Sequence, residues 1–167
     1  MDIFEIIKTR RSIRRFTDEP VSDEIIDSII EAGIWAPSGM NNQPWKFAVI
    51  KDSVLRGKIS NLTKYSKTVL SANALIAVFL DHSSSYDNTK DIQAIGACMQ
   101  NMLLTVHSIG LGAVWLGEIL KSKDKVLELL EGPKEFELMA VIALGYPAEK
   151  GGKGKRKGQG EKVFLKK

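Results

Sequence analysis

A stretch near the N-terminus, TRRSIRRF, contains four arginines within six positions around one serine. In a continuing helix Arg10 and Arg14 would lie one turn apart on one face, and Arg11 and Arg15 on another. If the helix ends near Ser12, the arginines can instead gather around one point with the serine hydroxyl and free backbone N–H groups. Charge-assisted bonds of this kind contribute roughly 1.5–3 kcal/mol each and suit a dianion such as a phosphate monoester. The alternative is a solvated basic turn or one paired with nearby acids.

A second polar stretch, APSGMNNQPW, covers residues 36–45. We expect a loop here, because prolines and a glycine interrupt regular structure. Side chains that both donate and accept hydrogen bonds suit a polar heterocycle or a polyol chain. The polar members of the stretch are Ser38, Asn41, Asn42 and Gln43. A polar turn between a helix and a strand is the alternative interpretation.

A third stretch, GLGAVWLG at residues 110–117, superficially matches a dinucleotide-binding fingerprint. A Rossmann glycine loop follows a strand and opens a helix, whereas this one follows a helix and opens a strand. We therefore reject the Rossmann interpretation. The first glycines are expected to cap the preceding helix, and Gly117 would let a flat ligand approach the backbone closely.

The elements that must position these stretches follow from hydrophobic periodicity and turn residues. A continuous apolar run, ALIAVFLD, predicts a strand buried on both faces, and apolar spacings of three and four predict one long helix. The expected helices cover residues 2–10, 22–36, 53–61, 88–109 and 123–132, and the expected strands cover residues 44–51, 74–81, 113–117 and 136–147. The class is α+β, in a single domain over residues 1–167 with a basic extended or mobile tail over residues 148–167.

Charge is unevenly distributed along the 167 residues, whose net charge is +4. Residues 150–167 carry eight Lys/Arg and one acid, a local charge of +7, so the rest of the chain carries −3. A mildly acidic body argues against a nucleic-acid binder, which would spread basic charge over the fold. One cysteine and two histidines predict no metal site, and the absence of an apolar run of about 18 residues predicts no membrane span. A cytoplasmic location is expected.

The order of the motifs is more specific than any one of them. RRSIRRF, then PSGMNNQPW, then a long helix leading into GLGAVWLG, then ALGYP and a basic tail resembles the nitroreductase family of flavoproteins. The resemblance implies that the anion is the phosphate of FMN, held by Arg10 and Ser12, with Arg11 and Arg14 as helpers. It also implies a basic residue from the tail on the phosphate, either Lys155 or Arg156.

The same resemblance implies how the flavin ring is held. Pro37, Ser38 and Gly39 match the loop that lies along the isoalloxazine and reaches it from a partner subunit, and Asn41 and Gln43 fall in the same motif. Leu116 and Gly117 match the stretch whose backbone N–H groups face flavin N5 and O4. A mid-chain contact is expected somewhere in residues 64–66. The implied fold has a central, mostly antiparallel sheet flanked by helices, in an intertwined homodimer built around the 88–109 helix.

The implied activity is an FMN-dependent oxidoreductase. Hydride from NADH or NADPH would reach flavin N5 and then pass to a nitroaromatic, quinone or similar small-molecule acceptor by a ping-pong mechanism. His82, in the short HSSSY loop, could reach a substrate. Two alternatives stay open: a flavin-binding carrier or sensor without turnover, and sibling flavin chemistry on the same fold, such as flavin fragmentation or reductive dehalogenation.

Overall fold

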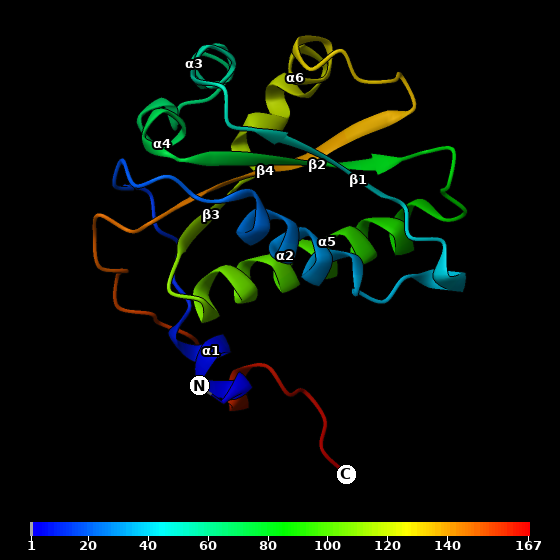
Figure 1. The fold of residues 1–167 in the computed structure, drawn as a ribbon. Helices are drawn as coiled ribbons and strands as arrows, with labels where there is room; N and C mark the ends of the chain where they lie inside the picture. The colour runs from blue at the N-terminus through cyan, green and yellow to red at the C-terminus, as the bar shows by residue number, and fades with distance from the viewer. Residues whose placement is uncertain (1) are drawn as a thin grey trace.

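A four-stranded antiparallel sheet forms the centre of the computed structural model, which describes residues 2–167 (Figure 1). Its strand order is β1-β2-β4-β3, so β3 and β1 are the edges. Every neighbouring pair is antiparallel. The strands are β1 (Trp45–Ile50), β2 (Ala74–Asp81), β3 (Gly112–Leu116) and β4 (Phe136–Gly145). The α+β class and the antiparallel sheet predicted from the sequence are confirmed.

Helices cover both faces of this sheet (Figure 1). The helices α2 and α5 pack against one face, and α3, α4 and α6 lie over the other. Their bounds are α2 (Asp23–Ile34), α3 (Ser53–Ser60), α4 (Ser66–Ser71), α5 (Asn88–Ser108) and α6 (Lys123–Leu129). Three short 3₁₀ segments complete the order: η1 (Gly39–Asn41), η2 (Glu118–Ser122) and η3 (Gln159–Glu161). The short helix α4 is the element that hydrophobic spacing does not predict.

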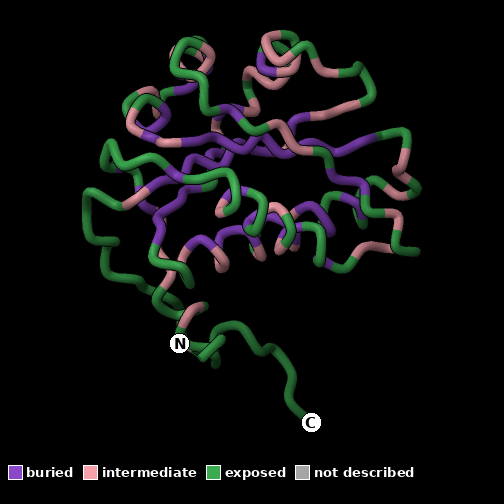
Figure 2. Tube along the Cα trace, viewed as in Figure 1, coloured by how far each residue is buried: buried purple, intermediate pink, exposed green. Residues whose placement is uncertain are grey.

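Strand β2 explains why an uninterrupted apolar run folds as a strand. Every residue of β2 is buried, because one set of alternate side chains faces α2 and α5 and the other faces the helices opposite. Ile76 and Val78 belong to the first core, and Leu75 and Ala77 to the second. Burial therefore follows the sheet and the sheet-facing side of α5 (Figure 2). Burial on both faces makes β2 the rigid centre to which the other strands attach.

The two long helices begin and end where the sequence indicates. Ser22 caps α2, its hydroxyl accepting the Ile25 N–H at 3.4 Å. After α5 the chain turns at Gly110, whose φ of +85° is a left-handed conformation that glycine adopts without strain. The turn returns the chain to the sheet as β3. The start of β3 therefore lies beside the C-terminal end of α5.

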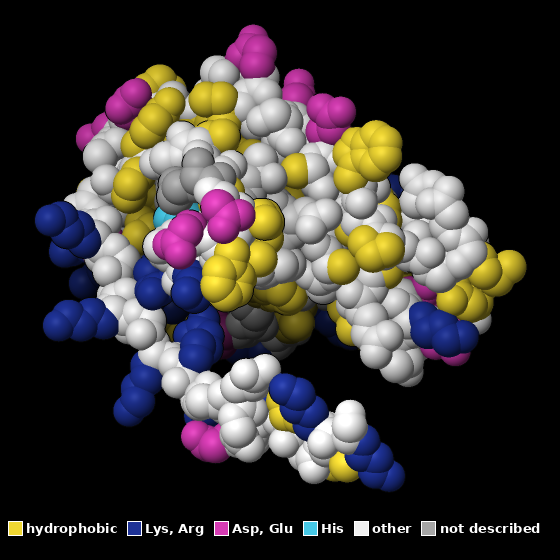
Figure 3. All heavy atoms as spheres, turned by 90° about the horizontal axis from the view of Figure 1, so that it is seen from below, with side chains coloured by type: hydrophobic (Ala, Val, Ile, Leu, Met, Phe, Trp, Pro, Cys, Tyr) yellow, Lys and Arg dark blue, Asp and Glu magenta, His cyan; other side chains and the backbone are white. Residues whose placement is uncertain are grey.

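The two ends of the chain meet beside β3. Helix α1 (Ile3–Thr9) buries none of its residues, and its apolar side chains Ile3, Phe4 and Ile7 are about half exposed or more. Beyond α1 the chain is extended and bridges to Ala113 and then to Pro147. The tail runs back beside α1, and Lys and Arg side chains gather along it in the view from below (Figure 3). Within the described residues, no helix is both long and apolar enough to cross a membrane.

Candidate functional site

The arginine cluster lies where α1 ends and the chain becomes extended. Arg10 caps α1 with an extended backbone (ψ 130°), and Ser12 then pairs with Ala113 of β3. In extended chain, alternate side chains face the same side. Arg10, Ser12 and Arg14 therefore share one side, while Arg11 and Ile13 line a hollow of about 500 Å³ on the other. The structure thus divides the arginines, whereas the sequence suggested one point of convergence.

The guanidinium of Arg11 is hydrogen-bonded to backbone carbonyls. Its Nε donates to the Gly152 carbonyl at 2.9 Å, and its Nη1 donates to the carbonyls of Lys8 (2.6 Å) and Arg10 (2.7 Å). These bonds fix the guanidinium between α1 and the tail. Within the chain the Arg11 side chain thus binds backbone carbonyls, and its expected helper role on an anion stays a prediction.

Arg156 of the tail brings further positive charge to Arg10. With Ile7, Lys8, Arg11 and Gly154 it lines a hollow of about 300 Å³. The pKa of Arg10 is lowered by partial burial, then by the charges of Arg156 and Arg11. Of the two expected tail residues, Arg156 is thus the one whose charge acts on Arg10, and the Lys155 carbonyl accepts an Arg156 N–H at 2.8 Å.

No carboxylate within residues 2–167 forms a salt bridge with the arginines of this cluster. The nearby acid Glu149 accepts the backbone N–H of Arg14 at 2.9 Å. Cations that are held together without a carboxylate repel one another, and an anion would relieve that repulsion. The cluster is therefore suited chemically to a phosphate.

Strand β3 extends from this cluster along an open edge. The Ile13 N–H donates to the Ala113 carbonyl at 3.0 Å, so the backbone groups of Ala113 face this edge. By the pleat of the strand, the N–H groups of Trp115 and Gly117 face the same way. Four residues of strand cover about 13 Å at roughly 3.3 Å each, a length on the scale of a mononucleotide.

Gly117 ends that edge, and the fold does not require a glycine there. A Cβ built on it would have only Trp115 Nε1 nearby, at 3.8 Å, and its φ of −84° suits any residue. The Trp115 side chain beside it is 40% exposed. Leu116 is buried and points its side chain into the core between β3 and α6. Space beside a backbone edge at Gly117 is what a flat ligand needs.

The mid-chain turn at residues 64–66 lies next to Gly117 through Glu118. The Glu118 carboxylate accepts the Thr63 hydroxyl at 2.7 Å and the Lys64 N–H at 3.1 Å, and it pairs with Lys121. The hydrogen bonds from Lys121 and Thr63 lower the pKa of Glu118 to about 2. The turn is thereby fixed to the end of β3.

The 36–45 loop faces two different hollows. Pro37, Ser38 and Gly39 line one of about 290 Å³ together with Tyr86, whose hydroxyl lies where a Cβ on Gly39 would be. By contrast, Asn41 and Gln43 line a separate hollow of about 540 Å³, together with the exposed side chain of Trp35. The first three residues thus line one hollow and the other two line another, although the backbone N–H of Asn41 donates to the Ser38 carbonyl at 3.1 Å.

This loop has an unusual backbone that its own hydrogen bonds hold. Met40, Asn41 and Gln43 all have left-handed φ values, of 54°, 56° and 48°. Non-glycine residues in that region cost energy and persist only where surrounding contacts hold them. One such contact is internal, because the Ser38 hydroxyl accepts the Gln43 N–H at 3.0 Å.

The other contact is a buried carboxylate, Asp91, in the first turn of α5. Asp91 is fully buried and accepts the Asn42 amide at 2.8 Å, the Ser85 hydroxyl at 2.6 Å and the Tyr86 N–H at 3.0 Å. Burial alone would raise its pKa, but hydrogen bonds led by those from Ser85 and Asn42 bring the pKa below its ordinary value. Asp91 is not among the residues that the sequence motifs indicate. Its signal is an acid at a core position of an otherwise apolar helix stripe.

The two halves of the predicted site lie at opposite ends of α5. The loop contacts the start of α5, whereas the arginine cluster lies at its far end, where Thr9 Oγ1 and His107 Nε2 are 2.8 Å apart. A helix of 21 residues is about 30 Å long. Within one chain, Pro37–Gly39 and Arg10 are therefore not brought together.

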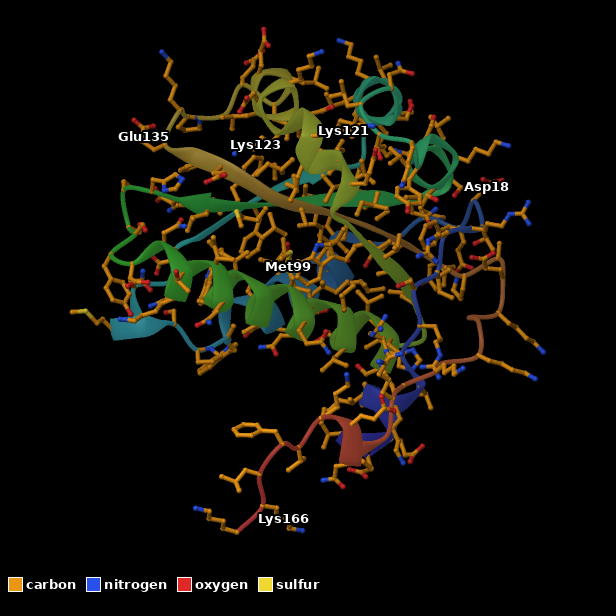
Figure 4. The ribbon with its side chains drawn as sticks, turned by 180° about the vertical axis from the view of Figure 1, so that it is seen from behind. Asp18, Met99, Lys121, Lys123, Glu135 and Lys166 are labelled. Atoms are coloured by element: carbon orange, nitrogen blue, oxygen red, sulfur yellow. The ribbon has the colours of Figure 1, made fainter. Side chains whose placement is uncertain are left out.

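His82 and Cys98 lie away from the arginine cluster, and each has contacts that explain its place in the fold. The Nε2 atom of His82 lies 2.8 Å from the Glu137 carboxylate, and the His82 backbone N–H donates to the Glu135 carbonyl at 2.9 Å. Glu135 lies at the far end of the sheet from the tail, which carries Lys166 (Figure 4). Cys98 is buried in the α5 core beside Met99, and burial raises its pKa to about 12. Neither His82 nor Cys98 lies at the arginine cluster.

Comparison with known proteins identifies the family of this chain. The nitroreductase family model matches residues 7–75 and 60–146. A Methanothermobacter thermautotrophicus protein, provisionally named NADH dehydrogenase/NAD(P)H nitroreductase, is 39% identical over 155 residues, which are 91% of this chain and 81% of that protein. The NADPH-flavin oxidoreductase of Vibrio harveyi is 32% identical and covers 86% of this chain, which spans 65% of its length.

Solved structures share the whole fold. A Desulfovibrio desulfuricans protein, provisionally named a nitroreductase and determined in complex with FMN, is 44% identical, with a TM-score of 0.95 over 100% of this chain and 98% of that one. The NADPH:FMN oxidoreductase of Vibrio harveyi, determined with NAD⁺, has a TM-score of 0.92 at 27% identity over 100% of this chain and 78% of that one. This chain belongs to the nitroreductase family.

Proposed function

We propose that this protein is an FMN-dependent NAD(P)H oxidoreductase that acts as a homodimer. Bound FMN would supply the chemistry at N5, accepting hydride from NADH or NADPH and passing electrons to nitroaromatic, quinone or similar acceptors in a ping-pong cycle. Family membership supports the general activity, and the FMN complex of the 44% identical relative supports the cofactor. The single observation that carries the proposal is the uncompensated arginine cluster at the start of the open β3 edge.

The residues present fit the phosphate of FMN. Arg10, Ser12 and Arg14 share one side of the extended segment, and Arg156 adds charge from the tail. We assign Arg10 and Ser12 to the phosphate oxygens, because a guanidinium and a hydroxyl both donate to such oxygens. The acidic body repels anions elsewhere, so the cluster is the favoured place for one.

The open end of β3 fits the isoalloxazine. The Trp115 and Gly117 N–H groups face that edge. The fold does not require a glycine at position 117, and the missing side chain leaves room there for a ring. N–H groups aimed at a ring edge stabilise negative charge that develops there. The turn at Lys64, fixed through Glu118, would add a cation near the same end. Leu116 would contribute its backbone rather than its buried side chain.

A second copy of the chain would complete the site. Two α5 helices packed antiparallel would bring the Pro37–Gly39 loop of one chain to the arginine cluster of the other. The outer face of α5 suits such packing, because Ile92 is 42% exposed and no atom lies within 4 Å of a Cβ built on Gly96. Gln93 and Gln100 are also exposed, so the exposed side of the helix mixes polar and apolar residues. A cytoplasmic location, expected from the single Cys98, is part of the same proposal.

The decisive experiment is an anaerobic titration of the FMN-reconstituted, desalted protein with NADH and, separately, NADPH. We expect the visible flavin band to bleach at about one nicotinamide per flavin, and a nitroaromatic or quinone added next to restore it. A retained band that neither donor bleaches would favour the carrier or sensor alternative. Failure to retain any flavin would overturn the proposal.

The dimer has its own test. Sedimentation equilibrium should give twice the 18.5 kDa mass of the chain. The substitution Gly96→Arg should lower both the mass and the flavin content, because a long side chain would separate the two α5 helices. Gly57→Arg, at another glycine with open space, is the matched control and should change neither. A monomer that binds FMN at full affinity would contradict this part of the proposal.

A further inference from the structure

We propose that Arg11 is a positioning residue that latches the glycine-rich tail onto α1 and thereby brings Arg156 to Arg10. The latch is a property of the chain itself. Its effect on FMN rests on the function proposed above. The proposal gives a role to two features of the sequence that the flavin site leaves unexplained: the second arginine of RRSIRR and the glycines of residues 151–154.

The contacts of Arg11 are those of a clamp between two segments. Its guanidinium donates to the carbonyls of Lys8 and Arg10, which belong to the C-terminal end of α1. The same guanidinium donates to the carbonyl of Gly152, 141 residues later in the chain. A planar fork can make such bonds in several fixed directions at once, which a lysine ammonium cannot reproduce. Arg11 thus joins the two ends of the chain.

The glycines of the tail are explained by this clamp. A Cβ on Gly151 would meet Arg11 Cβ at 2.5 Å and Cγ at 2.7 Å, close to the Arg11 backbone. A Cβ on Gly154 would overlap the guanidinium itself. The tail can therefore lie over Arg11 only because both positions lack a side chain. Gly158, beyond this segment, has nothing within 4 Å of a built Cβ.

The consequence of the clamp is electrostatic. Two residues after Gly154 the chain reaches Arg156, which lines the same hollow as Arg11 and Gly154. From there its charge lowers the pKa of Arg10, second only to the effect of burial. Arg156 is exposed and forms no salt bridge with the described carboxylates, so attraction to an acid does not hold it there. Like charges do not approach unless something else binds them. The Arg11 bonds and the packing over the two glycines supply that attachment.

The first test measures the latch without flavin. Trypsin cleavage after Lys153 is followed by mass spectrometry in the full chain and in the Gly151→Ala and Arg11→Ala variants. Loss of charge-assisted bonds should speed cleavage about ten-fold to a hundred-fold, because the docked segment must open before it is cut. Gly158→Ala should leave the rate at Lys153 unchanged, and the rate after Lys166, near the chain end, should not change in any variant. Equal rates at Lys153 in all four proteins would overturn the proposal.

The second test measures the effect on the phosphate. Arg11→Ala should weaken FMN binding about ten-fold, leave riboflavin binding unchanged, and add less than two-fold in an Arg156→Ala background. Arg11→Lys, which keeps the charge and loses the fork, should behave like Arg11→Ala. Two results would overturn the proposal, because each would mean that Arg11 acts on the phosphate by its own charge. One is a further ten-fold loss of FMN affinity when Arg11→Ala is added to Arg156→Ala, and the other is normal FMN affinity in Arg11→Lys.

The two tests separate the two proposals. If no protein in the series binds FMN but the cleavage rates change as expected, the latch stands and the flavin function fails. If FMN binds normally in every variant and the cleavage rates are equal, the latch fails and the flavin function stands.

Discussion

The two ends of α5 solve different physical problems. At its start, the 36–45 loop is held in a left-handed backbone by hydrogen bonds that converge on buried Asp91, so its shape exists without a ligand. At its far end, Arg10 lies within the field of Arg156 and neither forms a salt bridge with a carboxylate among the described residues, so the two cations repel each other until an anion binds. One end is organised in advance and the other is completed by its ligand.

The comparison predicts where a substitution will appear. Damage at the loop end should lower the stability of the chain, because satisfied buried hydrogen bonds are lost there. Damage at the arginine end should lower affinity and leave stability unchanged or raise it.

The largest effect is expected from Asp91→Ala. It would leave the Asn42 amide, the Ser85 hydroxyl and two backbone N–H groups without their acceptor, at a cost on the order of 3–5 kcal/mol in the free energy of unfolding. Urea unfolding measures this cost. The matched control is Asp87→Ala at the same helix end, which removes a cap to the Lys90 N–H and an exposed ion pair with the Lys90 ammonium, and should cost about 1 kcal/mol. Equal costs would break the comparison.

The next effect is expected from Arg10→Ala. Loss of one charge-assisted contact to the phosphate should weaken FMN binding by roughly 1.5–3 kcal/mol, or about ten-fold to more than a hundred-fold. The free energy of unfolding without FMN should stay the same or rise, because repulsion from Arg156 is removed. Fluorescence titration and urea unfolding provide the two measurements. A destabilised variant with unchanged FMN affinity would reverse the assignment.

A smaller effect is expected at Gly117. Gly117→Val should leave stability unchanged, since a built Cβ has open space, and should weaken FMN binding about ten-fold because the side chain would occupy the ring edge. Gly33→Ala is the opposite case, because its Cβ would meet Met102 Cγ at 2.9 Å and Cys98 Sγ at 3.1 Å. It should lower the melting temperature and leave FMN affinity unchanged. Normal flavin affinity in Gly117→Val would remove β3 from the site.

The smallest effect concerns pH. Burial and the charges of Arg10 and Arg11 lower the pKa of His107, so the unfolded chain binds more protons than the folded chain below about pH 6.5. Stability that this group contributes is therefore present above that pH and is lost as the pH falls. His107→Gln should flatten the fall between pH 7 and 5, and FMN, by adding negative charge near Arg10, should flatten it in the wild type. Parallel curves for both proteins would contradict this.

Much of the fold could be predicted from the sequence. The run ALIAVFLD appears as β2 at residues 74–81, and the 88–109 spacing appears as α5 over Asn88–Ser108. Both depend on short-range periodicity, which the chain carries locally. Helix α4 was missed because its six residues are too few for a period to be recognised.

Residue type and motif order indicate Arg10, Ser12 and Gly117, and the assignment of each to the flavin stays a prediction. What the sequence determined was local: which stretches are charged, polar, apolar or glycine-rich, and in what order. Charge and periodicity are properties of neighbouring residues, so they can be recognised without the fold. The order of the motifs along the chain is likewise a property of the sequence, and it is enough to indicate the family.

How those stretches meet depends on the tertiary structure. It divided the arginines between two sides of an extended segment, bound Arg11 to Gly152 across 141 residues, and separated Pro37–Gly39 from Arg10 by the length of α5. It also revealed Asp91 as the acceptor that holds the loop. These features depend on side-chain direction and on contacts between distant residues, which are fixed only when the sheet and its helices pack together.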